Sequence, residues 1–500
     1  MGAIVAALSK CDDDVVHLVI TMLEALIHRG ANSHEVITPN SAVSAPSLGE
    51  LRKKSNSSSI VSIGRNVSNT RWRSESFRSK KDGYAAVSEG EFFPQYLAHP
   101  FNKIGISRRC LLQRTAKGLL RDFDGCFTFA VASSRQILAG RDKLGLMPLY
   151  YGENEKLCAI ASERKALWKI GITEVCSFPP GNLAVVSPAG FAFKHVSTIK
   201  QPPQRKMKID EAARRLQRLL EESTRERLLD VEKVGVAFSG GLDSSVIARL
   251  AQRCGISVNL ISVGLEGQPE LVHAKEAAKA LCLPIIVQTF KMADVEKALS
   301  KALWLIEEPS VMKVCVAIPL FWTAKVASKL GYCVLLAGQG ADELFGGYHR
   351  YLTLYARCGI EKVAEAIYSD TITSYERNFQ RDEPVSTFHK VGLRLPFVDT
   401  SVVDFALSLP VDLKVESEGD DLRKRVLRQV ARNLGISASI ADKPKKSIQF
   451  ATGVDRALRD LAKGKGLTPR EYVEELLGTI YPGLRVQESE HSRLLQPKIS

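Results

Sequence analysis

A buried strand that runs into two glycines and then a helix constrains the fold of this chain more than any other feature. The segment Val234 to Ser245 reads V-G-V-A-F-S-G-G-L-D-S-S. The glycines at 240 and 241 let the backbone approach a ligand closely. A helix that begins near Asp243 contributes free N–H groups and a partial positive charge. The turn therefore predicts a site for an anion such as a phosphate group.

The phosphate turn also carries a carboxylate, which needs a cation. Asp243 would repel a bare phosphate, so its presence favours a bridging Mg²⁺. The segment 336–348, L-A-G-Q-G-A-D-E-L-F-G-G-Y, also follows an apolar strand and carries the pair Asp342 and Glu343. We expect these carboxylates to lie beside the phosphate turn and to bind Mg²⁺. Helix N-capping is the structural alternative for Asp342.

Periodicity predicts two different folds in the two parts of the chain. After residue 210, apolar runs at 234–238, 258–263, 285–287 and 333–336 alternate with helical stretches. This indicates an α/β domain with a doubly wound parallel sheet, whose ligands bind at the carboxyl ends of the strands. Earlier, short β-like runs at 126–131, 136–139, 157–160 and 182–186 indicate a sheet-rich α+β domain.

These patterns divide the 500 residues into a first domain at 1–200, a linker at 201–209, a second domain at 210–480 and a tail at 481–500. The apolar residues 1–8 lack a basic flank and predict a buried first strand rather than a signal peptide. Residues 44–83 are rich in Ser, Arg, Lys and Asn, which predicts a loop-rich insertion or a poorly ordered excursion.

Composition predicts a cytoplasmic protein without a membrane span. No run approaches the length of consecutive apolar residues that a membrane helix needs. The ten cysteines are scattered without a C-x-x-C pair, which indicates reduced thiols and no metal site. The net charge of +14 is spread along the chain and no RNA-binding motif is found, so we do not expect a nucleic-acid partner.

Together, the two glycine-rich segments resemble the asparagine synthetase B family, whose pattern is S-G-G-L-D-S followed by S-G-E-G-[AS]-D-E-x-F-G-G-Y. The resemblance continues in G-R-D-K-L-G-L-M-P-L-Y-Y at 140–151, A-S-E-R-K-A-L at 161–167, F-P-P-G at 178–181, R-L-P-F-V-D at 394–399 and a basic segment at 443–450. It spans roughly residues 120–455. It implies a class II glutamine amidotransferase-like domain of the Ntn-hydrolase type, followed by an N-type ATP pyrophosphatase, or PP-loop, domain.

The resemblance implies asparagine biosynthesis: an amide ligase that makes asparagine from aspartate, ATP and a nitrogen source through β-aspartyl-AMP, with Mg²⁺. The residues it implies for the pyrophosphate are Ser239, Gly240, Gly241, Asp243 and Ser244. Those implied for adenosine, largely through the backbone, are Ala237, Val263, Ala337 and Gly338. The implied magnesium ligands are Asp243 and Asp342. One of Lys445 and Lys446 would stabilise negative charge in the transition states.

The first domain departs from the family at its nucleophile. The family uses a cysteine at position 2, exposed as the new N-terminus, whereas this chain has Gly2. The family's N-G-E segment corresponds to 89–91, where Glu89 would repel an oxyanion. His28-Arg29-Gly30 is a remnant that we interpret as a structural turn. We therefore predict that glutaminase activity is lost and that nitrogen comes from free ammonia or from a separate amidotransferase.

The second departure is Gln339, which stands where the family has a glutamate beside the intermediate. An amide cannot act as a base near neutral pH. Either Glu343 or Asp382 assists, or ammonia loses its proton to solvent or phosphate, or the substrate differs. Gln339 thus joins Lys445 and Lys446 as a candidate catalytic position.

Other functions and partners stay open at this point. The alternatives are an amide ligase for another carboxylate, a non-catalytic regulatory homologue and a tRNA-modifying PP-loop enzyme. The sequence does not identify the groups that bind aspartate, and it leaves a homo-oligomer open. The candidates for aspartate by residue type alone are Arg350, Arg377, Arg381 and Asp382, which ordinary salt bridges explain equally well.

Overall fold

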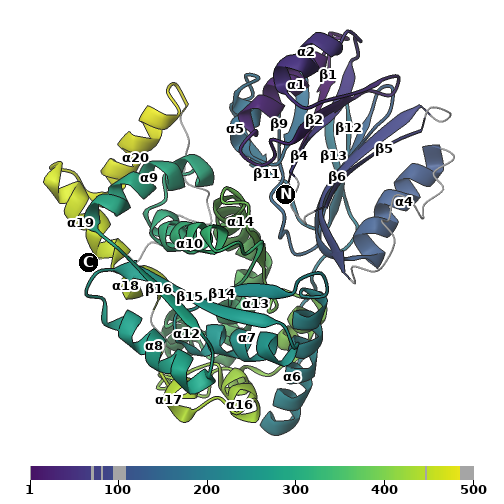
Figure 1. Ribbon diagram of the computed structural model, residues 1–500. Helices are drawn as coiled ribbons and strands as arrows, with labels where there is room; N and C mark the ends of the chain where they lie inside the picture. Colours follow the sequence, from purple (N-terminus) through teal and green to yellow (C-terminus); the bar gives the residue numbers. More distant parts are fainter. Residues whose placement is uncertain (1, 69–72, 80–82, 94–108, 445–446, 485–500) are drawn as a thin grey trace. The chain divides into compact units, whose positions relative to one another are not determined.

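The computed structural model describes residues 2–68, 73–79, 83–93, 109–444 and 447–484. The chain forms two compact units, Met1–Ile199 and Lys200–Ser500 (Figure 1). Each unit has its own sheets and its own buried clusters. We describe them in turn.

The first unit contains two antiparallel sheets. The seven-stranded sheet has the order β11-β9-β10-β1-β4-β2-β3, with bounds Cys176–Ser177, Tyr150–Glu153, Leu157–Ala161, Ala3–Ser9, Val61–Val67, Ser33–Ile37 and Ala42–Ala45. The six-stranded sheet has the order β13-β12-β8-β7-β6-β5, with bounds Gly190–His195, Asn182–Ser187, Ile137–Arg141, Asp124–Ala132, Tyr84–Phe93 and Arg73–Ser79. Its helices are α1 (Val16–Ala25), α2 (Leu48–Lys54), α4 (Arg109–Asp122) and α5 (Arg164–Trp168).

Strand β1 shows why these sheets stack in layers. Ala3, Val5 and Ala7 pack against α1, α2 and α5, whereas Ile4, Ala6 and Leu8 on the opposite face pack against the second sheet. The second sheet is covered on its far face by α4. Because both faces of β1 are covered, every residue of the strand is buried. The predicted buried first strand and the sheet-rich α+β fold are confirmed.

The prediction for residues 44–83 is wrong. This segment supplies α2 and the strands β4 and β5, apart from residues 69–72 and 80–82, which lie outside the described residues. β4 even occupies the interior of its sheet, between β1 and β2. The cause is the short run around Val61 and Ile63, whose side chains are fully buried although Ser and Asn dominate the flanks. Two buried apolar residues on one strand face outweigh the polar composition around them.

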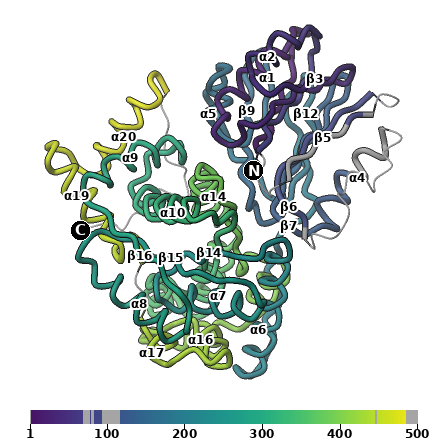
Figure 2. Tube along the Cα trace, viewed as in Figure 1, coloured from purple at the N-terminus to yellow at the C-terminus, as the bar shows by residue number. Residues whose placement is uncertain are grey.

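The second unit is built on a five-stranded parallel sheet with the order β16-β15-β14-β17-β18. The strands are Ile285–Phe290, Ser257–Leu265, Lys233–Ala237, Val334–Leu336 and Gly392–Arg394. Figure 2 shows β16, β15 and β14 side by side along the sheet. The chain then returns to add β17 and β18 on the other side of β14, so the strand order reverses between β14 and β17. Ligands of such sheets bind where this reversal opens a crevice.

Helices cover both faces of this sheet, which confirms the doubly wound architecture. One face is covered by α7 (Leu242–Arg253) and α8 (Pro269–Leu281), and the other packs against α9 (Met292–Ile306), α10 (Val311–Lys329) and α14 (Gln380–Thr387) (Figure 1). The remaining helices are α6 (Ile209–Glu226), α11 (Ala341–Phe345), α12 (Arg350–Cys358), α13 (Ile360–Ser374), α15 (Thr400–Ser408), α16 (Arg425–Asn433), α17 (Ala438–Ala441), α18 (Ile448–Ala451), α19 (Val454–Gly464) and α20 (Pro469–Ile480). A π-helix, η1 (Tyr375–Phe379), joins α13 to α14, and a short 3-10 turn, η2 (Val411–Leu413), follows α15.

One helix meets the length and composition of a membrane span. Among the described residues this is α10, whose most apolar window is 72% buried inside the protein. Trp322 and Phe321 of α10 belong to a buried cluster that packs on the sheet. A helix that is apolar all round suits the core of a large soluble domain as well as a membrane, and its burial favours the core.

Candidate functional site

The two glycine-rich turns lie next to each other, at the point where the strand order reverses. The first follows β14 and the second follows β17, and these strands are neighbours. A Cβ built at Gly338 would lie 2.9 Å from the Cβ of Asp243, so the two turns are in contact. Gly240 and Gly340 have φ values of +72° and +91°, a conformation that favours glycine. Both turns therefore need glycine to come this close.

The residues assigned by resemblance to adenosine and pyrophosphate all lie at this one edge of the sheet. They lie at or near the carboxyl ends of β14, β15 and β17. Ala237 ends β14, and it is followed by Ser239, Gly240, Gly241, Asp243 and Ser244. Val263 lies near the end of β15, and Ala337 and Gly338 follow β17. Parallel strands bring their carboxyl ends to a common edge. This explains why segments about a hundred residues apart in sequence meet here.

The first turn leaves the start of α7 open to a ligand. Gly241 is the N-cap, and no side chain caps the helix. The Ser239 hydroxyl accepts a hydrogen bond from the Gly241 N–H at 3.3 Å, and the Ser244 hydroxyl lies 3.3 Å from that of Ser239. Nε2 of His273 lies 3.1 Å from the Gly240 carbonyl oxygen, and this contact stabilises the turn. Two hydroxyls and uncapped N–H groups thus face one small region, which suits a phosphate group.

A lysine that no sequence motif singles out joins the two turns. The Lys424 ammonium group lies 2.7 Å from both carboxylate oxygens of Asp243 and 2.6 Å from Oδ1 of Asp342. Its side chain is only 4% exposed. Burial lowers the pKa of Lys424, while the Asp243 carboxylate acts to raise it. Lys424 lies in the run D-D-L-R-K-R at 420–425, which looks like an ordinary surface segment.

Asp243 and Asp342 therefore meet as predicted, but Glu343 does not join them. Its Oε1 accepts hydrogen bonds from the amide of Asn378 at 2.7 Å and from the Tyr348 hydroxyl. Consecutive helical residues point about 100° apart, so Asp342 and Glu343 of α11 cannot face the same point. Among the described residues, no group of three or more His, Cys, Asp or Glu side chains is arranged to hold a metal ion. Glu343 is thus engaged by Asn378 and Tyr348, and its role as a magnesium ligand stays a prediction.

Gln339 is held by a buried ion pair. Its amide nitrogen donates to Oδ2 of Asp382 at 3.1 Å. Asp382 is fully buried and receives two hydrogen bonds from the Arg381 guanidinium group, at 2.7 and 3.0 Å. An ionised carboxylate only accepts hydrogen bonds, so the NH₂ group of Gln339 must face Asp382. The carbonyl oxygen of Gln339 consequently points away from Asp382 and is presented as an acceptor.

The arginines considered for aspartate are engaged by carboxylates of the chain itself. Arg381 pairs with Asp382, and both Arg350 and Arg377 pair with Asp370. The π-helix η1 carries Arg377, which pairs with Asp370, and its neighbour Asn378, which donates to Glu343. Single π turns are frequent at functional sites. The two lysines considered for catalysis, Lys445 and Lys446, lie outside the described residues.

The first unit contains a second buried polar cluster, around the start of the chain. Arg29 is fully buried, and its guanidinium group donates to Oε1 of Glu89 at 2.9 Å, to Oε1 of Glu163 at 3.1 Å and to the Gly2 carbonyl oxygen at 2.8 Å. The Gly2 N–H lies 3.3 Å from Oε1 of Glu89, and the Ser162 hydroxyl donates to Oε2 at 3.0 Å. The carboxylate at 89 is thus surrounded by donors from Gly2, Arg29 and Ser162.

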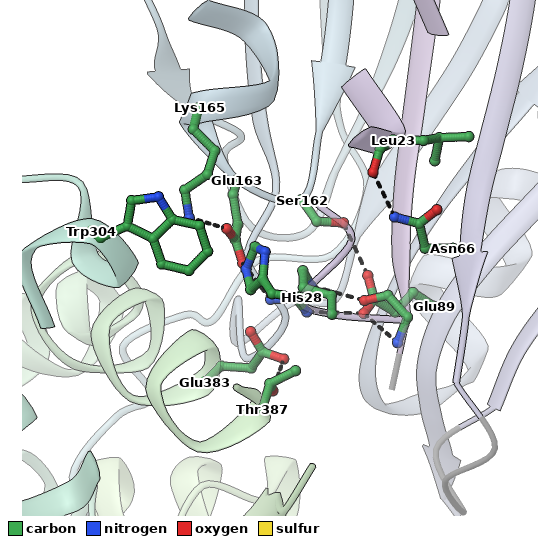
Figure 3. Close-up of polar contacts among 12 residues, drawn as sticks. Leu23, His28, Asn66, Glu89, Ser162, Glu163, Lys165, Trp304, Glu383 and Thr387 are labelled. Atoms are coloured by element: carbon green, nitrogen blue, oxygen red, sulfur yellow. Dashed lines mark hydrogen bonds and ion pairs between the residues drawn. The ribbon is translucent and has the colours of Figure 1, made fainter. Parts of the chain in front are cut away.

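Glu163 forms the other half of this cluster (Figure 3). Its two oxygens lie 3.0 Å from Nε2 of His28 and 2.5 Å from the Lys165 ammonium group. Burial alone would raise the pKa of Glu163, but His28, Lys165 and Arg29 outweigh burial and hold it well below its usual range. Burial lowers the pKa of His28. Two cations and two carboxylates therefore lie together in this cluster and compensate one another's charge.

Comparison with known proteins follows the same division of the chain. Residues 215–361 and 356–481 match the asparagine synthase family, and residues 69–169 match the glutamine amidotransferase domain family. The chain is 30% identical over 404 residues to "Putative asparagine synthetase (glutamine-hydrolyzing) 1" of Methanocaldococcus jannaschii, covering 71% of this chain and 74% of the relative. It is 26% identical to "Asparagine synthetase B (glutamine-hydrolyzing)" of Escherichia coli, covering 71% and 65%.

Solved structures give weaker matches. A glutamine phosphoribosylpyrophosphate amidotransferase from B. subtilis shares 15% identity and a TM-score of 0.34, covering 57% of this chain and 65% of its own. An NMN synthetase from Francisella tularensis shares 15% identity and a TM-score of 0.28, covering 59% and 100%.

Proposed function

Because the chain belongs to the asparagine synthetase family, we propose that it converts aspartate to asparagine with ATP and ammonia, through β-aspartyl-AMP. Family membership supports an ATP-dependent amide ligase. The observation that carries the finer proposal is the contact between the two glycine-rich turns. It brings the open start of α7, two serine hydroxyls and the carboxylates of Asp243 and Asp342 to one place.

In this proposal the phosphate groups of ATP are held by the turn after β14, and adenosine lies against Ala237, Val263, Ala337 and Gly338. Asp243 and Asp342 would hold Mg²⁺. The donor set fits this ion, since Mg²⁺ is bound in proteins by one or two carboxylates together with substrate phosphates. The two carboxylates also already share one cation, the Lys424 ammonium group. When bound, the metal would neutralise the charge of the phosphates.

The first unit supports ammonia, rather than glutamine, as the nitrogen source. The family has its nucleophile at position 2, where this chain has Gly2, which carries no side chain. The position at which an amide should stabilise an oxyanion carries Glu89, locked by Arg29 and Ser162. The nine cysteines whose side chains the structure describes are free thiols, which supports the proposed cytoplasmic location.

Gln339 would position the amine that attacks the intermediate. Asp382 fixes the amide so that its carbonyl oxygen accepts a hydrogen bond from an N–H group, without taking the proton. The same geometry would suit any amine that attacks the adenylate. An amide at the position where the family has a base favours one alternative function, a ligase of the same class that acts on another carboxylate substrate.

The substitution Gln339→Glu tests this role. The introduced carboxylate would lie beside Asp382, and two adjacent carboxylates share a proton. When protonated, it donates to Asp382 and presents a carbonyl oxygen, as glutamine does. As pH rises and it ionises, we expect the rate of amide formation relative to wild type to fall by about tenfold. Taking the ratio at each pH cancels the protonation of ammonia itself. A ratio that rises with pH would show that a base is missing at this position in the wild-type chain.

The function is tested by pyrophosphate release from ATP with Mg²⁺, screened over amino acids. We expect release that depends on aspartate, with asparagine formed from ammonia and no glutamate formed from glutamine. Release that depends on a different carboxylate would establish the alternative ligase. No release with any amino acid would indicate a non-catalytic homologue, and ordinary glutamine hydrolysis would contradict the role assigned to the first unit.

A further inference from the structure

Lys424 occupies the place where a cation is expected between the two glycine-rich turns. Its ammonium group makes three contacts of 2.6 to 2.7 Å, two with Asp243 and one with Asp342. The carboxylates come from different segments, one after β14 and one after β17. Without a cation between them, two negative charges would face each other in a partly buried site. Lys424 is thus the group that holds the two turns together in the free protein.

The backbone around Lys424 is built to keep it there. Arg423 and Lys424 have φ values of +48° and +54°, a left-handed conformation that is unfavourable for both residues. The loop is fixed by hydrogen bonds from Arg428 to the Arg423 carbonyl oxygen at 2.6 Å and from Arg423 to the Gly347 carbonyl oxygen at 3.2 Å. Strained residues persist only where the surroundings over-determine them, and they cluster at functional sites.

Gly347 leaves the space that Lys424 needs. A Cβ built at this position would lie 2.0 Å from Oδ1 of Asp342 and 2.3 Å from Cε of Lys424. No side chain larger than hydrogen fits without moving the ion pair. The second glycine-rich turn is therefore shaped around the lysine stem as well as around its carboxylates.

From this geometry we propose that Lys424 is a tethered cation that positions Asp243 and Asp342 and excludes Mg²⁺ until a nucleotide is present. The proposal rests on the proposed function for the identity of the nucleotide as ATP. Two carboxylates and one ammonium carry a net charge of −1. Among the further charges that act on Lys424, those of Glu343 and Arg428 have opposite signs. A bare Mg²⁺ would turn this balance into an excess of positive charge, whereas a metal that arrives with phosphate groups would not.

Binding of Mn²⁺ to the free protein, followed by its EPR signal, tests the proposal without measuring activity. Mn²⁺ takes the same oxygen ligands as Mg²⁺. We expect weak binding to wild type without nucleotide and at least tenfold tighter binding to Lys424→Met. Addition of a non-hydrolysable ATP analogue should tighten binding to wild type by far more than binding to the variant, so that the two affinities approach each other. Lys424→Arg keeps the charge and should stay weak without nucleotide.

The matched control is Lys414→Met, which removes another buried lysine from the same part of the chain but leaves both carboxylates in place. It should bind Mn²⁺ as wild type does. If Lys424→Met fails to fold, Lys424→Gln carries the same expectation, since its amide can donate to a carboxylate without charge. Unchanged Mn²⁺ affinity in the neutral variants, or an arginine variant that binds like them, would overturn the proposal. Neither of these two results bears on the proposed function, which is tested by aspartate-dependent pyrophosphate release from the wild-type protein. Absence of that release, with the Mn²⁺ results as expected, would contradict only the proposed function.

Discussion

Glu89→Asn is expected to destabilise the first unit by about 3 to 5 kcal/mol, and not to create a glutaminase. The substitution restores the amide of the family's N-G-E segment. However, it also removes the Glu89 carboxylate, which together with Glu163 compensates the fully buried Arg29. Glu163 cannot take over, because His28 and Lys165 already occupy its oxygens. A buried guanidinium group would lose a charged partner without gaining another.

The measurement is urea unfolding of the full chain, together with glutamate release from glutamine. The control is Glu153→Gln in the same unit, which breaks the exposed ion pair of Glu153 with Lys10 and should cost about 1 kcal/mol or less. If the two variants unfold at the same urea concentration, the cluster around Arg29 does not stabilise the unit as we infer. If Glu89→Asn hydrolyses glutamine, the Glu89 carboxylate prevents glutaminase activity in the wild-type protein, and Gly2 does not.

Much of the second unit could be predicted from the sequence because its signals are local. Each apolar run between 234 and 336 became a parallel strand, and the glycines after β14 and β17 predicted that both turns reach one edge of the sheet. The approach of Asp243 to Asp342 follows from this, since parallel strands align their carboxyl ends. In contrast, β18 is only three residues long and carries no pattern that a sequence window could detect.

The contacts that complete the site could not be predicted, because they depend on backbone conformations without a sequence signal. Lys424 reaches Asp243 from a loop in which two consecutive non-glycine residues are left-handed. Asp382 reaches Gln339 because a π-helix shifts the register between α13 and α14. Neither feature is indicated by residue type or spacing. Sequence could name Asp382 only as one candidate among several charged residues.

The first unit shows a related limit. The resemblance pointed to Gly2 and Glu89 as departures from the family, but not to the contacts that Glu89 makes in this chain. The structure shows a balanced set of charges in which Arg29 connects Glu89 to Glu163. A remnant interpreted as a structural turn, His28-Arg29-Gly30, turns out to supply the centre of that network. Burial of complementary charges depends on side chains from strand β6, from the turn after α1 and from the start of α5, and only the folded chain brings them together.

Lys414→Met is expected to stabilise the second unit by about 4 kcal/mol near pH 7 and by about 1 kcal/mol near pH 9.5. Lys414 is only 2% exposed and lines a small pocket with apolar residues that include Ile367, Leu407 and Leu409. No carboxylate partner of its ammonium group is found among the described residues, and burial alone lowers the pKa of Lys414 to about 7.

The sign of the pH dependence follows from the lowered pKa. In the unfolded chain the pKa of Lys414 returns to its ordinary value of 10.5, so between about pH 7 and 10.5 the unfolded chain binds more protons than the folded one. The stability of wild type should therefore rise with pH across this window, whereas the methionine variant has no such contribution. Urea unfolding of both proteins at the two pH values measures the difference, with the exposed Lys297→Met as a control that should be insensitive to pH. A stability difference that is the same at both pH values would mean that Lys414 keeps its proton in the folded protein throughout, held by a partner or by water, and the methionine variant would then be the less stable of the two.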